Sequence, residues 1–202
     1  MVQTIPPPAK KYPYFFTPNL SSIRLTHEQF WDVCRDNPEL RLELTSNGGL
    51  IVMPPAGSKT GLRNFNLTGQ FAKWVEQDGT GVGFDSSTGF TLPNKAVRSP
   101  DVSWVRREKW NALSPEAQER FAPLCPDFVI ELRSSSDTPK SLQAKMHEYL
   151  ENGLQLGWLI DPLQRRVYVY RPGEEVEVLM DPATVSADPF LPGFELHLAE
   201  LW

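Results

Sequence analysis

Cysteine, histidine and long apolar runs are all scarce in this sequence of 202 residues. The two cysteines, Cys34 and Cys125, lie far apart and form no CxxC pair, and the three histidines are scattered along the chain. A structural zinc site needs four ligands at clustered spacings, so this pattern argues against one. We expect both cysteines to be reduced thiols, as in a cytosolic protein.

No apolar run approaches the roughly 18 residues that a membrane-spanning helix requires. The first residues, MVQTIPPPAKK, lack the apolar segment of a secretory signal. We therefore expect a cytoplasmic protein with no membrane partner.

The sequence also lacks an excess of positive charge. Its formal net charge is −5, with 20 Lys and Arg against 25 Asp and Glu. A surface that is basic throughout is therefore excluded. A local basic groove for nucleic acid is not excluded, because enough Lys and Arg remain to form one.

Proline, by contrast, is abundant, and it is concentrated at the start of the chain. Residues 1–18 contain PPP, YP and TP, which predict an extended arm without a core of its own. Aromatic residues at 12–16 suggest that the arm packs on its own domain or on a partner subunit. The length suits one domain, and we assign residues 19–202 to it.

Capping and turn residues define the elements of the first half of the chain. Thr26, with Gln29 three residues on, forms a capping-box pattern that predicts a helix over residues 26–37. LRLELT, NGG and LIVM predict a β-hairpin, and apolar periodicity predicts a helix over residues 58–78. VGFDSSTGFTL has the pattern of a second hairpin.

The second half contains short apolar strands around one clear helix. PDVSWV and FVIELR predict strands, TPKSLQAKMHEYLENG predicts a helix, and LGWLI, RRVYVYR and EVEVLM predict further strands. The helix between FVIELR and LGWLI predicts a crossover connection. The fold class is therefore α/β (α+β), with a mixed central β-sheet flanked by helices.

Charged residues stand out in the strand FVIELR. Alternation places Glu131 and Arg133 on one face, opposite Phe128, and buried charges need a partner or a task. The strand PDVSWV adds a second acid, Asp101. Two carboxylates on adjacent strands would form a site for Mg²⁺ or Mn²⁺, which prefer hard oxygen ligands.

The helix after FVIELR supplies a cation. Its apolar residues, including Met146 and Tyr149, should face the sheet, and Lys145 lies on the flank of that arc. A lysine there can reach past the apolar face toward the end of the neighbouring strand. Two acids, a metal and a cation suit phosphodiester hydrolysis, because the cation stabilises the developing negative charge.

Several stretches together resemble a known family. SPDVSW, PDFVIELRSSSD, LQAKMHEYLENGLQLGWLIDP and VYVYRPG are similar to the motif series of bacterial restriction-endonuclease-like proteins within the PD-(D/E)XK nuclease superfamily. The resemblance covers roughly residues 22–180. It implies a restriction-endonuclease-like core, a metal-dependent site and commonly a homodimer.

The resemblance also assigns residues. Asp101 and Glu131 match the two acids of the motif and are thereby implied to be catalytic metal ligands. Arg133 stands where the motif usually has lysine, and arginine can bind phosphate but cannot act as a base. In this family the resemblance implies that the lysine lies on the helix after the strand and not in the strand motif, and Lys145 matches that position. Glu43 matches an acid of an early strand and is implied to assist as a ligand of metal or water.

Each assignment has a structural alternative. Arg133 could be only an ion-pair partner of Glu131 or Asp137, and Lys145 could be a solvated helix residue. Glu43 also fits an exposed strand face. Arg106 and Arg107 could form the DNA-binding edge of a groove or a solvated loop.

Two functions follow from these residues. The first is a Mg²⁺-dependent endonuclease that hydrolyses DNA, with Asp101, Glu131, Lys145 and Glu43 as catalytic residues and Arg133, Arg106 and Arg107 as substrate-binding residues. The second is a catalytically inactive nuclease-fold protein that binds nucleic acid or a protein partner. The acidic net charge and the arginine at position 133 favour the second.

Overall fold

The computed structural model describes residues 22–53 and 55–202, so the predicted arm over residues 1–18 lies outside it. The helices of the described residues are α1 (His27–Asp36), α2 (Ser58–Asp78), α3 (Arg107–Asn111), α4 (Pro115–Glu119) and α5 (Pro139–Glu151). None of these helices is long and apolar enough to span a bilayer.

The largest sheet of the described part of the chain is six-stranded and mixed. Its strands, in spatial order, are β10 (Glu177–Met180), β9 (Arg166–Tyr170), β8 (Leu156–Asp161), β7 (Phe128–Leu132), β6 (Val102–Arg106) and β3 (Gly81–Asp85). β7 and β8 are parallel and are joined through α5, while the other neighbours are antiparallel. The predicted crossover helix and mixed central sheet are confirmed.

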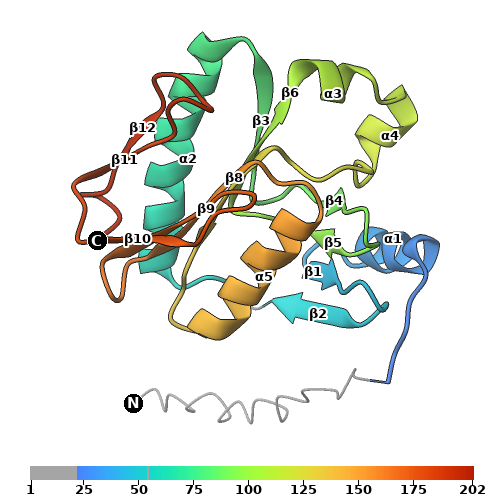
Figure 1. Cartoon of the computed structure of the whole chain (residues 1–202). Helices are drawn as coiled ribbons and strands as arrows, with labels where there is room; N and C mark the ends of the chain where they lie inside the picture. Colours follow the sequence, from blue (N-terminus) through green and yellow to red (C-terminus); the bar gives the residue numbers. More distant parts are fainter. Residues whose placement is uncertain (1–21, 54) are drawn as a thin grey trace, which may run out of the picture.

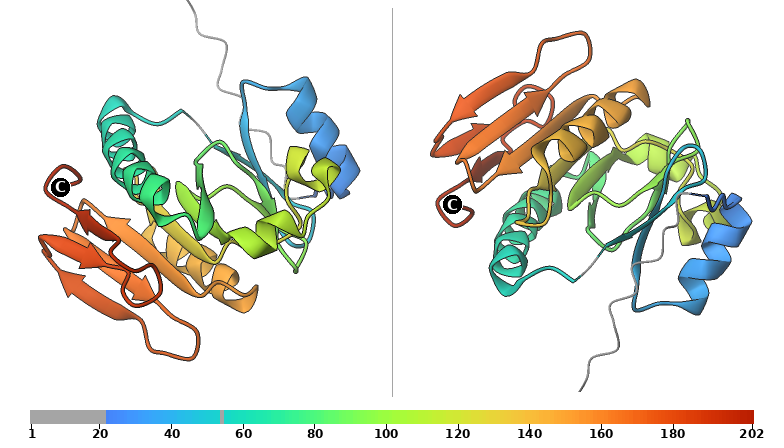
Figure 2. Two further views of the ribbon diagram at one scale, coloured as in Figure 1. Left: turned by 90° about the horizontal axis from the view of Figure 1, so that it is seen from above. Right: turned by 90° about the horizontal axis from the view of Figure 1, so that it is seen from below.

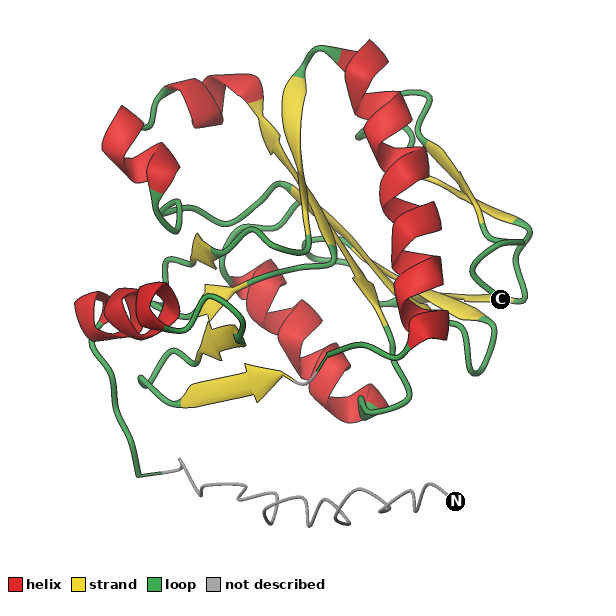
Figure 3. Ribbon diagram, turned by 180° about the vertical axis from the view of Figure 1, so that it is seen from behind, coloured by secondary structure: helices red, strands yellow, loops and turns green. Residues whose placement is uncertain are grey.

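Helices cover the two faces of this sheet, as the alternation in β7 requires. Phe128 and Ile130 face α2 and belong to the cluster that contains Leu67 and Phe71. Val129 faces the other way, into the cluster that contains Met146 of α5. Seen from behind, α2 runs across the strands in front and α5 lies beyond them (Figure 3).

A second, four-stranded sheet lies beside α5, again within the described residues (Figure 1). Its order is β2 (Leu50–Met53), β1 (Arg41–Leu44), β5 (Val97–Arg98) and β4 (Phe90–Thr91). The predicted hairpin of LRLELT and LIVM is therefore confirmed as β1 and β2. Phe30 of α1 packs with Leu44 and Val97 in a small core of its own.

The predicted second hairpin, VGFDSSTGFTL, is wrong. β3 pairs with β6 in the large sheet, whereas β4 pairs with β5 in the smaller one. Gly81 and Gly83 explain the separation, because a Cβ at Gly81 would collide with the ring of Trp104 and one at Gly83 would press on Phe71. β3 therefore fits closely beneath these rings, and the chain then crosses to the other sheet.

The end of the chain forms a small hairpin, β11 (Thr184–Ser186) and β12 (Glu195–His197), which docks on the α2 side. Phe194 lies edge-on to Phe71 with ring centroids 5.2 Å apart, and Leu196 is fully buried. Figure 2 shows these C-terminal strands on the side of the molecule away from α1. The C-terminal segment is therefore packed into the core on the α2 side.

Capping residues fix where the helices start. Thr26 caps α1 in the predicted capping box, with Gln29 returning its side chain to the backbone N–H of Thr26 at 2.9 Å. Thr138 caps α5 by accepting a hydrogen bond from the backbone N–H of Ser141, and Pro139 occupies the first turn. The start of α5 determines which of its residues face the two sheets.

Candidate active site

The candidate site lies where the two sheets meet α5. A cleft of about 170 Å³ is lined by Asp101, Glu131 and Lys145, together with residues of the β2–α2, β3–β4 and β7–α5 connections. Val102 pairs with Ile130, so the antiparallel register places Asp101 beside Glu131 at the end of their strands. The sheet therefore brings the two predicted metal ligands into one cleft.

Lys145 lies between two of the predicted catalytic acids. Its Nζ is 2.8 Å from Oε1 of Glu43 and 2.8 Å from Oε1 of Glu131, and only 14% of the side chain is exposed. Burial tends to lower the pKa of Lys145, but the two carboxylates outweigh it and hold the pKa above its usual range. Lys145 is therefore a buried ammonium group and not a solvated helix residue.

Glu131 is a buried acid of the cleft whose surroundings shift its pKa strongly. Tyr149 donates its hydroxyl to Oε1 of Glu131 at 3.0 Å, and the side chain is almost fully buried. Burial is the main cause that raises the pKa of Glu131 to about 7, with Asp101 and Glu43 adding to it and Lys145 opposing it. Its charge therefore depends on pH in the neutral range.

Asp101 is held from two directions. Asn64 of α2 donates its Nδ2 to Oδ1 of Asp101 at 3.0 Å, and the backbone N–H of Leu132 donates to Oδ2 at 2.8 Å. Burial raises the pKa of Asp101, although both hydrogen bonds act against this rise. The Oδ1 of Asn64 is buried without a hydrogen-bond partner among the described residues, which leaves an acceptor beside Asp101.

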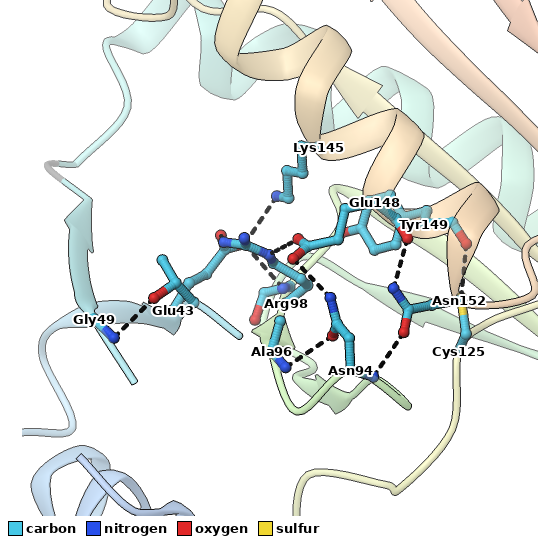
Figure 4. Close-up of polar contacts among 12 residues, drawn as sticks. Glu43, Gly49, Asn94, Ala96, Arg98, Cys125, Lys145, Glu148, Tyr149 and Asn152 are labelled. Atoms are coloured by element: carbon cyan, nitrogen blue, oxygen red, sulfur yellow. Dashed lines mark hydrogen bonds and ion pairs between the residues drawn. The ribbon is translucent and has the colours of Figure 1, made fainter. Parts of the chain in front are cut away.

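Glu43 connects the site to a buried ion-pair network (Figure 4). Arg98 contacts Oε2 of Glu43 at 3.0 Å and Oε2 of Glu148 at 2.6 Å, and the backbone N–H of Ser99 donates to Oε1 of Glu43 at 3.0 Å. Burial tends to raise the pKa of Glu43, but Lys145 and Arg98 outweigh it and lower the pKa. Glu43 is thus a buried carboxylate that contacts two cations, and not part of an exposed strand face.

The predicted substrate-binding arginines lie outside this cleft. Arg133 forms a 2.7 Å ion pair with Asp161 of β8, so Glu131 is not its partner. Arg106 lies over the ring of Phe190, and Arg107 donates to the carbonyl oxygens of Gly79 and Gly81. Arg106 and Arg107 lie at the end of β6 that is far from Asp101. Their position does not support contact with a phosphate bound beside Asp101. Their role in binding substrate stays a prediction.

Four residues of the site were not identified from the sequence: Arg41, Asn64, Arg98 and Glu148. Arg41 shares a strand face with Glu43, so alternation alone could have indicated it. Arg98 lies opposite Glu43 only because β1 pairs with β5, and that non-local pairing has no local sequence signal. Asn64 had no signal beyond its place on a predicted helix.

The donor set fits a divalent cation of the magnesium type. Asp101 and Glu131 are neighbouring carboxylates, and each oxygen of Asp101 accepts a single hydrogen bond, which leaves lone pairs free. In residues 22–53 and 55–202, no three His, Cys, Asp or Glu side chains are placed to enclose a metal ion. Two carboxylates are sufficient for Mg²⁺, which usually keeps several of its waters.

The raised pKa of Glu131 predicts how stability responds to pH in EDTA. Between about pH 4.5 and 7 folded Glu131 binds a proton that the unfolded chain does not, so raising the pH through this range destabilises the folded state. The expected loss is about 3 to 4 kcal/mol of unfolding free energy, since the pKa rises from 4.5 to about 7 and each pKa unit corresponds to about 1.4 kcal/mol. Urea denaturation of wild type and Glu131→Gln at several pH values measures it. Parallel pH curves for the two proteins would contradict the prediction.

The mixed sheet, its flanking helices and the acidic cleft beside a buried lysine define a restriction-endonuclease-like protein. The sequence profile of a family named Uma2 and described as "Putative restriction endonuclease" matches residues 27–199, and the chain belongs to this family.

A solved structure has a similar fold. It is described as a "putative nuclease belonging to DUF820 from Anabaena variabilis ATCC 29413", and the two chains superpose with a TM-score of 0.68. Their sequences are 24% identical over 81% of this chain and 90% of that one, so the likeness concerns the fold alone. No curated protein matches the sequence.

Proposed function

We propose that this protein is a metal-dependent endonuclease that hydrolyses phosphodiester bonds of DNA. The observation that carries the proposal is the placing of Asp101, Glu131 and Lys145 on the lining of one cleft. Family membership supports nuclease chemistry, and the two carboxylates support a divalent cation.

Asp101 and Glu131 would hold Mg²⁺ or Mn²⁺. When bound, the cation would polarise the phosphate and make a water molecule more acidic. In hydrolysis, the water oxygen bonds to phosphorus, one bridging P–O bond breaks, and the leaving oxygen takes up a proton. The products are a phosphomonoester and an alcohol.

Lys145 would act as a fixed positive charge. Because its pKa is held above the usual range, it stays protonated and cannot accept a proton from water. It can donate hydrogen bonds to phosphate oxygens and stabilise the negative charge of the transition state. Glu43 would orient Lys145 from β1, and Tyr149 would orient Glu131 from α5.

The proposal is tested by metal binding and cleavage measured together. We expect wild type to bind Mn²⁺ in isothermal titration and to cut plasmid or single-stranded DNA with Mg²⁺ or Mn²⁺. Asp101→Ala should lose both properties, with cleavage reduced about 100-fold or more. Wild-type cleavage no faster than that of the variant would refute the proposal.

One observation favours the alternative, a catalytically inactive protein that binds nucleic acid or a protein partner. Lys145 contacts both Glu43 and Glu131, and Arg98 also contacts Glu43, so cations of the chain already offset much of the charge of these two acids without a metal. Absence of Mn²⁺ binding at millimolar concentration, together with retained DNA binding, would support this alternative.

The resemblance to the nuclease motif series also implied a homodimer, and we propose this state for the working protein. The described residues comprise one chain, and the arm over residues 1–18 lies outside them. A single monomer mass in sedimentation analysis would contradict a dimer.

A further inference from the structure

One cation of the cleft makes no direct ion pair with a carboxylate of the described residues. Among the described residues that line it, the cations are Arg41 and Lys145. Lys145 contacts Glu43 and Glu131, whereas Arg41 forms no ion pair within 4.0 Å in the described part of the chain. It lies near enough to Asp85 and Asp101 for its charge to act toward lowering the pKa of both carboxyls. A cation without a direct ion pair, on the wall of an acidic cleft, would attract an anionic ligand.

The guanidinium of Arg41 is held in place by Ser86 of the β3–β4 connection, which also lines the cleft. Its Nη2 donates to the carbonyl oxygen of Ser86 at 2.9 Å and to the Ser86 hydroxyl at 2.6 Å. The neighbouring acid, Asp85, accepts hydrogen bonds from the N–H and hydroxyl of Ser87 instead. Nε and Nη1 of Arg41 have no hydrogen-bond partner in the described residues, so their hydrogens remain available.

Such a group is suited to phosphate. Arginine presents several N–H donors in a rigid plane that matches phosphate oxygens, and anchoring by Ser86 reduces the entropy lost when it binds. The β7–α5 connection lines the same cleft with Ser134, Ser135, Ser136 and Asp137. The Ser134 hydroxyl donates to Oδ2 of Asp137 at 2.7 Å and lies 2.8 Å from the Ser136 hydroxyl, so the Ser135 hydroxyl is the one without a hydrogen bond among the described residues. Neutral hydroxyl donors are common phosphate contacts and would add no repulsion.

We infer that Arg41, positioned by Ser86, binds a phosphodiester group of the nucleic-acid strand that enters the cleft. This inference rests on the proposed function, because it takes the substrate to be nucleic acid. The phosphate contact is thereby assigned to Arg41 of β1, and not to the three arginines that the sequence predicted to bind substrate. Arg133 is already paired with Asp161, and Arg107 with backbone carbonyl oxygens.

The test measures DNA affinity as a function of salt. Fluorescence anisotropy with labelled single-stranded and duplex DNA, in Ca²⁺ to suppress cleavage, compares wild type with Arg41→Gln. We expect about tenfold weaker binding near 0.1 M salt, because a charge-assisted hydrogen bond is lost. The slope of log K against log salt should fall by about 0.9 for duplex and about 0.7 for single strands, the value for one phosphate contact.

Two further variants separate binding from structure. Arg35→Gln is the matched control, since Arg35 is an exposed arginine of α1 that pairs with Asp32 and Asp36, and it should change neither affinity nor slope. Ser86→Ala keeps the charge of Arg41 and removes one hydrogen bond. We expect it to weaken binding only about two- to threefold, with the salt slope of wild type.

The outcomes distinguish this inference from the proposed function. If wild type binds and cuts DNA and Arg41→Gln binds with the same affinity and slope, the inference is overturned and the proposed function stands. Weaker binding with an unchanged slope and a lower melting temperature would make Arg41 structural and would also overturn it. A wild type that neither binds nor cuts either DNA would overturn both.

Discussion

Replacing Lys145 by methionine is expected to slow DNA cleavage by about 100- to 1,000-fold, the usual effect of removing one transition-state donor. The substitution removes the ammonium group from between Glu43 and Glu131 while keeping an unbranched side chain of similar length. Single-turnover cleavage at saturating Mg²⁺ measures the chemical step, and circular dichroism establishes that the variant is folded.

Lys140→Met is the matched control for this prediction. Lys140 lies in the first turn of the same helix, is exposed, and makes no ion pair among the described residues. We expect it to cut DNA at the wild-type rate. Cleavage by Lys145→Met within about threefold of wild type would show that Lys145 does not act in the chemical step.

The second large effect concerns stability. Arg98→Met is expected to lower the free energy of unfolding by about 3 kcal/mol or more, because it removes one of the two cations that contact buried Glu43 and the cation that contacts half-buried Glu148. Only 11% of the Arg98 side chain is exposed, so water can do little to replace the lost contacts. Urea denaturation in EDTA measures the change without a contribution from metal.

Arg165→Met provides a control with an ion pair of the same length. Arg165 contacts Asp181 at 2.6 Å, as Arg98 contacts Glu148, but more than half of each side chain is exposed. Exposed pairs contribute about 1 kcal/mol or less, so Arg165→Met should be nearly neutral. Equal losses in the two variants would contradict a special role for the buried network.

The sequence was most informative where local patterns determine geometry. Strand alternation placed Glu131 on the face opposite Phe128, and helix periodicity placed Lys145 on the flank of the buried face of α5. Both predictions are confirmed by the structure, and they were sufficient to indicate an acidic cleft with a lysine. The fold class followed from the same patterns and from the crossover helix.

Non-local strand pairing accounts for what the sequence did not reveal. The partner of Arg133 is Asp161 because Leu132 lies beside Ile160 in the parallel register of β7 and β8, a fact that neither strand encodes alone. The incorrectly predicted hairpin over residues 82–92 has a similar origin. Its turn residues are suited to a hairpin, but packing against Trp104 and Phe71 places β3 in the other sheet.

The position of α5 between two sheets has a consequence for the assembly of the site. Glu43 comes from the smaller sheet, Asp101 and Glu131 come from the larger one, and Lys145 reaches Glu43 and Glu131 only from α5. Without α5 in place, the three acids lack Lys145, the cation that contacts both Glu43 and Glu131. The site is therefore complete only when α5 is docked on both sheets, and a nascent chain that lacks α5 has no assembled site.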